Sequence, residues 1–195
     1  MAYPHDWYAT HEITGIQMEN SSPRFFELAA KTAVSHTLTY VLMGILAAYF
    51  LNYAASMARP DSGMRPMTDP MVMAGPLFQP LRGLVFALVF YPFRDRLFGK
   101  KDGWLVMSWM LIGLGIIATF GAASGSMEGM IYTPTPILYQ LRGGLEVVPQ
   151  AMLLSALLCY WINHREKKWL NWLLGVLFVI VVTLPILGLM VTKRT

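Results

Sequence analysis

The sequence has little charge: only 13% of its 195 residues are Asp, Glu, Lys or Arg, whereas 55% are hydrophobic. A soluble domain carries about 25% charged residues, so this composition is typical of a membrane protein. The net charge of +4 does not indicate nucleic-acid binding, because the basic residues lie in short loops beside apolar stretches and form no basic face or RNA-binding motif. We therefore expect the chain to associate with a lipid bilayer and not with nucleic acid.

Cysteine is almost absent as well. The single one, Cys159, permits no internal disulfide and offers no metal-ligand spacing. The sequence also lacks an HExxH motif, a Ser-His-Asp arrangement, a glycine-rich phosphate loop and paired intramembrane aspartates. These absences predict a protein that is not an enzyme and that requires no cofactor.

Long apolar stretches predict the membrane spans, because a helix needs about 20 apolar residues to cross a bilayer core of ~30 Å. Three stretches carry no charged residue, namely 35–57, 103–123 and 169–192. Two further stretches contain arginine, namely 77–98 and 136–163. The predicted fold is an all-α polytopic membrane protein, with five transmembrane helices bundled over residues 34–195.

Residues 1–33 form a polar leader without the short apolar core and cleavage site of a signal peptide. Ser22 can cap a helix and Pro23 suits its first position, so the end of the leader is predicted to form an interfacial helix. The alternative is that this segment is the solvated start of the first span.

Basic loops orient the predicted spans. Loops 94–101 and 164–168 are rich in Lys and Arg, whereas loop 124–135 has none. The positive-inside rule therefore places the first two loops and the N-terminus in the cytoplasm and loop 124–135 outside. We expect a multi-pass protein of the bacterial inner (plasma) membrane.

Two segments separated by 60 residues share the pattern Pro-x4-Leu-Arg-Gly, beginning at Pro76 and Pro136. Each is followed by a basic loop and a tryptophan-led apolar stretch. The pattern predicts an internal repeat of two helix hairpins, about 76–123 and 136–190, in the same orientation.

The two arginines of this repeat, Arg82 and Arg142, are the main candidates for a functional site. An arginine at the bilayer centre costs at least ~2.5–3.5 kcal/mol, so such residues usually have a partner or a function. Glu146 lies four residues after Arg142, on the same helix face, and was expected to neutralise it. The predicted site, open to the outside, binds a carboxylate, a phosphate or a lipid headgroup. It comprises Arg82, Arg142, Glu146, Gln79, Gln140, Gly83 and Gly143.

Three functions remain open from the sequence. The first is binding or conduction of an anionic solute or lipid at the arginine cluster. The second is an accessory subunit that packs against a partner membrane subunit or a second copy, with purely structural arginines that cross-link the hairpins. The third is a haem- or pigment-bearing subunit in which His36 and His164 are the ligands.

Overall fold

The computed structural model describes residues 22–57 and 64–192, and every regular element in this part of the chain is a helix. Four helical segments are long and apolar enough to cross a membrane. They are α2 (Phe25–Phe50), the segment Gly75–Leu97 that begins with α5 (Gly75–Phe90), α9 (Ile137–Asn163) and α10 (Lys168–Thr192). The predicted all-helical class is thus confirmed, and four of the predicted spans correspond to helices that are long and apolar enough to cross a membrane.

The first long helix begins earlier than predicted. Helix α2 is continuous from Phe25, so the expected interfacial segment and the first span form one helix. Its first turns tolerate charge because Glu27 accepts a hydrogen bond of 2.9 Å from Lys31, one turn later. The helix ends before Asn52, whose φ of 45° is a left-handed conformation that asparagine adopts more readily than most residues. The short helix α3 (Tyr53–Met57) follows this break.

The predicted span 103–123 is shorter than expected. Helix α7 (Gly103–Ile112) continues into a π-helical turn, η2 (Gly113–Ile117), and regular structure stops there. Glycine destabilises a helix by about 1 kcal/mol relative to alanine, and Gly113, Gly115 and Gly121 all lie near this end. At ~1.5 Å per residue the helix is only ~22 Å long, so its length alone does not establish a fifth span.

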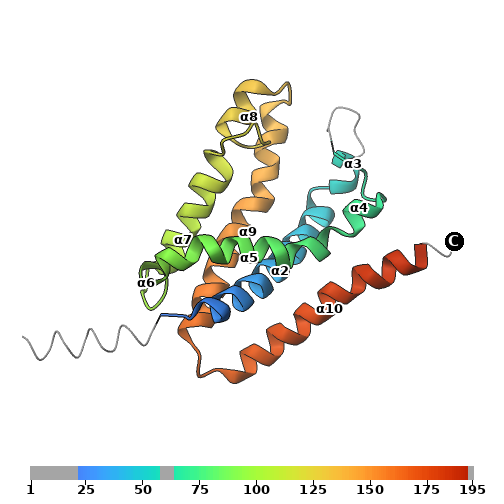
Figure 1. The fold of residues 1–195 in the computed structure, drawn as a ribbon. Coiled ribbons are helices and arrows are strands. Elements are labelled where there is room, and N and C mark those ends of the chain that lie inside the picture. The colour runs from blue at the N-terminus through green and yellow to red at the C-terminus, as the bar shows by residue number, and fades with distance from the viewer. Residues whose placement is uncertain (1–21, 58–63, 193–195) are drawn as a thin grey trace, which may run out of the picture.

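The helices pack tightly at only one end of the molecule. The main buried core joins the start of α2 to the end of α5, the start of α7 and the end of α9. Leu28, Phe90, Met107 and Leu158 come from these four regions, and Leu97 adds to them from the short helix α6 (Arg94–Leu97); each is at most 1% exposed. Toward the other end, the pair α7–α9 diverges from the pair α2–α5, and α10 lies on the far side of α2 (Figure 1).

Both basic loops lie at the tightly packed end. The Gly99 amide of one loop donates a hydrogen bond of 2.8 Å to the Asn163 side chain at the end of α9. Arg165, in the other loop, lies 3.2 Å from the Glu27 carboxylate at the start of α2. The two loops therefore share one end of the bundle, whereas α8 (Met127–Tyr132) lies at the other end (Figure 1).

The predicted duplication into two helix hairpins is not confirmed. Helix α5 packs chiefly against α2, and α7 packs chiefly against α9. Helix α10 packs chiefly against α2, with Leu170 and Leu174 buried. It does not pair chiefly with α9, as the second predicted hairpin requires. The sequence similarity around the two arginines therefore does not extend to equivalent packing.

Candidate functional site

A cavity of about 730 Å³ lies where the two helix pairs diverge. Ligand-binding pockets typically measure about 300–1,000 Å³, so a small molecule or a lipid headgroup fits. Helix α2 contributes six residues, and four of them, His36, Tyr40, Gly44 and Ala48, recur at four-residue spacing. The rest of the wall comes from α3, from α5 and the segment before it, from α7, η2 and the chain after them, and from α9.

Small residues keep this space open. A Cβ atom built at Gly44 or at Gly115 would meet no neighbouring atom within 4 Å. The π-helical turn η2 places Gly115 and Ile116 on the cavity wall, and Thr119 follows just after the helix end. Single π-helical turns are frequent at functional sites, where they shift the register of side chains.

Arg82 is the positive group of the cavity. It projects from α5 into the cavity and remains exposed there. Its guanidinium carbon lies 5.6 Å from the centre of the Phe86 ring, one helical turn later. Among the described residues, no carboxylate lies within the 4.0 Å limit of an ion pair with Arg82. The charge is therefore stabilised by an aromatic face and not by a counter-ion.

Glu146 is the negative group of the cavity. It projects from α9, is half-buried, and accepts a hydrogen bond from the Tyr53 hydroxyl of α3. Tyr40 lies within electrostatic range of both Glu146 and Arg82. The acid and the base thus share one cavity and flank one phenol, yet they form no ion pair with each other.

His36 also lines the cavity and is only 1% exposed. Its Nε2 atom lies 3.1 Å from Oε1 of Gln79, and its ring meets Phe86 edge-on at 4.9 Å. The Nδ1 atom has no hydrogen-bond partner among the described residues. Burial of a polar atom without a partner is costly, and no described protein group offsets that cost for this nitrogen.

Arg142 does not belong to this site, contrary to the prediction. Its guanidinium donates a hydrogen bond of 2.9 Å to the Leu51 carbonyl, at the end of α2. The first residue of α9 that lines the cavity is Glu146. Arg142 precedes it by one helical turn and lies outside the cavity. At that level α2 has ended, and its terminal carbonyls attract the guanidinium. The predicted Arg142–Glu146 pair is accordingly not formed in the described chain.

The other predicted site residues have packing roles. Gln140 is fully buried, donates to the Gly129 and Thr135 carbonyls and accepts from the Gly125 amide, so it ties loop 124–135 to the start of α9. Gly83 lies against α2, where a Cβ atom would stand 2.5 Å from the Ala33 Cα.

Gln79 and Gly143 do not line the cavity either. The Gln79 amide reaches His36 and donates to the carbonyl of Gly75 in its own helix. A Cβ atom at Gly143 would meet nothing within 4 Å, so no close approach requires glycine at that position.

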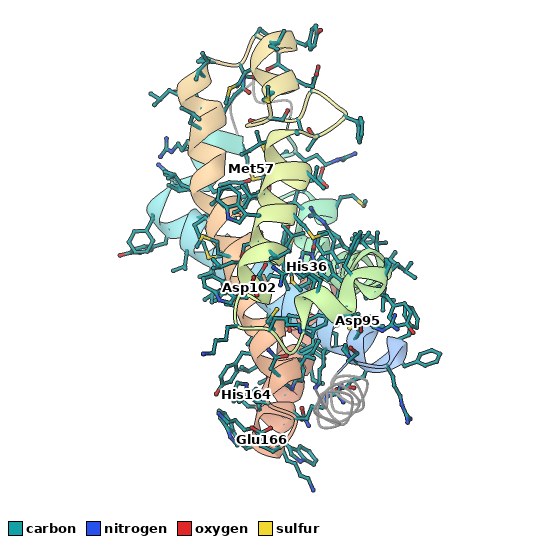
Figure 2. The ribbon with its side chains drawn as sticks, turned by 90° about the vertical axis from the view of Figure 1, so that its left-hand side faces the viewer. His36, Met57, Asp95, Asp102, His164 and Glu166 are labelled. Carbon is teal, nitrogen blue, oxygen red and sulfur yellow. The ribbon has the colours of Figure 1, made fainter. Side chains whose placement is uncertain are left out.

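The two candidate haem ligands are not brought together. His36 lies in the middle of the molecule, whereas His164 lies beside Glu166 at the far end from Met57 (Figure 2). His164 instead stacks on Tyr160 at 4.1 Å, and its Nδ1 atom is 2.8 Å from the Tyr160 carbonyl. The arrangement offers no shared position for one iron atom or one pigment.

Tyr40, Tyr53 and Gln150 are cavity residues that the sequence interpretation missed. A usable signal existed for two of them, since Tyr40 continues the four-residue spacing from His36 to Gly44, and Gln150 follows Glu146 by one turn. No sequence signal identified Tyr53, which follows the break after α2.

No protein-family model matches the chain, and neither a curated protein nor a solved structure is significantly similar to it. The functional conclusion therefore depends on the cavity and its side chains.

Proposed function

We propose that this chain is an integral membrane protein that binds or conducts an anionic solute or lipid headgroup at Arg82. In this proposal the five apolar helical segments cross the bilayer, and the basic loops and the N-terminus face the cytoplasm. The cavity then opens toward the outer side of the bacterial inner membrane. The function is binding or passage rather than catalysis.

The observation that carries the proposal is the unpaired charge of Arg82. A charged side chain inside the membrane costs at least ~2.5–3.5 kcal/mol and is normally paired. Arg82 faces a cavity large enough for a ligand, and its guanidinium lies over the Phe86 ring with no carboxylate of the described residues in ion-pair range. A phosphate or carboxylate would supply the missing counter-ion and accept the fork of guanidinium N–H groups.

The test is anion binding by the intact chain in mild detergent. We expect short-chain dihexanoyl phosphatidic acid to raise the melting temperature and to remain attached in native mass spectrometry. Arg82→Gln should weaken binding by about tenfold or more, since a charge-assisted contact is lost. Arg82→Lys should restore part of it, because the charge is kept without the fork.

Arg142→Gln is the matched control, because it removes the same charge outside the cavity. It should bind the probe as the unaltered protein does. The proposal is wrong if the unaltered protein does not bind the probe, or if Arg82→Gln and Arg142→Gln bind it equally well.

A second candidate function is that of an accessory subunit or a homo-oligomer. It is favoured by α10, since only 6% of the residues in an apolar 18-residue stretch of Lys168–Met190 are buried within the chain. Lipid alone accounts for such a surface, but a partner helix fits it equally well. Purification in mild detergent separates the two functions, since an accessory subunit co-purifies with a fixed partner in constant ratio.

A further inference from the structure

The cavity holds an acid as well as a base, and the two come from different helices. Arg82 is on α5 and Glu146 is on α9. Each is held by an aromatic side chain rather than by the other charge: Arg82 by the Phe86 ring and Glu146 by the Tyr53 hydroxyl. A ligand that carried only an anionic group would leave Glu146 without a counter-ion.

Arg82 and Glu146 line the same cavity without forming an ion pair. No ion pair within 4.0 Å joins Arg82 to Glu146. Tyr40 also lines the cavity and lies within electrostatic range of both Arg82 and Glu146. Opposite charges attract, so a fold that keeps these two apart on separate helices leaves each of them able to pair with a group of a ligand.

Much of the remaining wall is apolar. Val41, Ile45, Ile116 and Leu154 line the same cavity from three sides. A ligand with an apolar portion would bury it against these side chains, and the favourable free energy of that burial rises with the apolar area covered. Such a wall is poorly suited to a small, fully polar ion.

We propose that the cavity binds a zwitterion that carries an ammonium group and an anionic oxygen group on an apolar body, with the anionic group at Arg82 and the ammonium at Glu146. This inference rests on the proposed function, because it keeps the anion at Arg82, and it adds the charge that the ligand must carry at its other end. The Glu146 carboxylate and the nearby Tyr40 and Tyr53 rings offer an ionic partner and aromatic faces to an ammonium group.

The test compares three probes on the full chain in mild detergent. Dihexanoyl phosphatidylethanolamine carries both charges, dihexanoyl phosphatidic acid carries only the anion, and glycerophosphoethanolamine carries both charges without acyl chains. The unaltered protein should bind the phosphatidylethanolamine more tightly than the phosphatidic acid. Glu146→Gln should weaken binding of the phosphatidylethanolamine by about tenfold, because its ammonium group loses its partner. Binding of the phosphatidic acid should be unchanged or tighter.

Glu166→Gln is the matched control, since Glu166 is exposed at the opposite end of the molecule from Met57, which lines the cavity (Figure 2). It should change neither affinity. Tighter binding of the lipid than of glycerophosphoethanolamine supports the apolar body of the proposed ligand, whereas equal binding of the two contradicts it and overturns the proposal.

Two further results would overturn the zwitterion alone, and both differ from the failure of the proposed function. If phosphatidic acid binds through Arg82 but phosphatidylethanolamine binds no better, the site takes anions and the zwitterion is excluded. If Glu146→Gln weakens both lipids equally, Glu146 supports the fold and does not bind an ammonium group. If neither lipid binds the unaltered protein, anion binding itself fails and the zwitterion fails with it.

Discussion

The Arg142 guanidinium caps helix α2 through its 2.9 Å hydrogen bond to the Leu51 carbonyl. This contact joins the first turns of α9 to the end of α2, two elements far apart in the sequence. It assigns the two arginines of the repeated sequence pattern to different tasks, since Arg82 lines the cavity and Arg142 completes a helix end.

Arg142→Gln should therefore reduce stability slightly without weakening ligand binding. Hydrogen bonds of charged groups contribute ~1.5–3 kcal/mol, and solvent exposure lowers this to about 1 kcal/mol for an exposed side chain. That loss corresponds to a decrease of about 2–4 °C in melting temperature for a chain of this size. Tryptophan-fluorescence melting measures it, and a variant that melted normally but no longer bound phosphatidic acid would contradict the assignment.

Gly83→Ala should destabilise the protein, because the new Cβ atom would stand 2.5 Å from the Ala33 Cα of α2. The helices must move apart to relieve this overlap, and overpacking of this kind costs about 1–3 kcal/mol. Unfolding in a titration with sodium dodecyl sulfate should therefore occur at a lower detergent fraction.

Gly143→Ala is the control, because Gly143 follows Arg142 as Gly83 follows Arg82 but has open space around it. Alanine favours the helix by up to about 1 kcal/mol over glycine, so this variant should be unchanged or more stable. Equal destabilisation by both substitutions would mean that the two glycines have equivalent surroundings, as the predicted repeat requires.

Much of the fold could be predicted from the sequence, because apolar stretches free of charge must form helices in a membrane. The residues at which the helices begin and end could not be predicted in the same way. Helix α2 can begin at Phe25 because Lys31 and the distant Arg165 neutralise the Glu27 carboxylate in its first turn. No local sequence pattern reveals the contact with Arg165. The end of the third predicted span depends on the short π-helical turn η2, which periodicity alone does not indicate.

The site was predicted only in part, for a similar reason. Arg82 and Glu146 were identifiable as charges inside apolar stretches. Which charge faces the cavity depends on where the neighbouring helices end and how they diverge. Arg142 was predicted in the site because it resembles Arg82 in sequence, but its environment is decided by the position of Leu51 in α2.

The pKa of Asp102, in the loop before α7, should lie below the usual aspartate value. Arg96 donates two hydrogen bonds to its carboxylate, at 3.1 Å and 2.6 Å, and this contact is the main cause of the lowered pKa. Because the pKa is lower in the folded chain, the ion pair stabilises the fold above pH ~3.9, and that contribution is lost as pH falls through the folded pKa.

A carbon-13 NMR titration of the aspartate carboxyl groups measures this pKa, with Asp102→Asn to identify the signal. Arg96→Gln should raise the pKa of Asp102 toward ~3.9, because the charged donor is lost. An identical titration in both proteins would show that the pair does not persist in solution. Asp69 is an internal reference, since its pKa is lowered mainly by the Met71 amide and should not respond to Arg96→Gln.

The number of membrane crossings can be decided by cysteine labelling. Cys159 is the only cysteine and is buried, so a Cys159→Ala background allows single cysteines to be placed elsewhere. Lys101→Cys and Glu166→Cys test the two basic loops, and Tyr132→Cys tests α8, where the native side chain is 72% exposed. A membrane-impermeant maleimide should label Tyr132→Cys in intact cells and the other two only after permeabilisation.

This outcome requires the segment Gly103–Ile117 to cross the membrane although it is short for a span. Crossing is physically possible because Thr119, Ala123 and Ser124, which follow the helix end, line the cavity. Irregular backbone is tolerated at membrane depth when it borders a cavity rather than lipid. Should Tyr132→Cys be protected in intact cells together with Lys101→Cys, α7 does not cross. The chain would then have four spans.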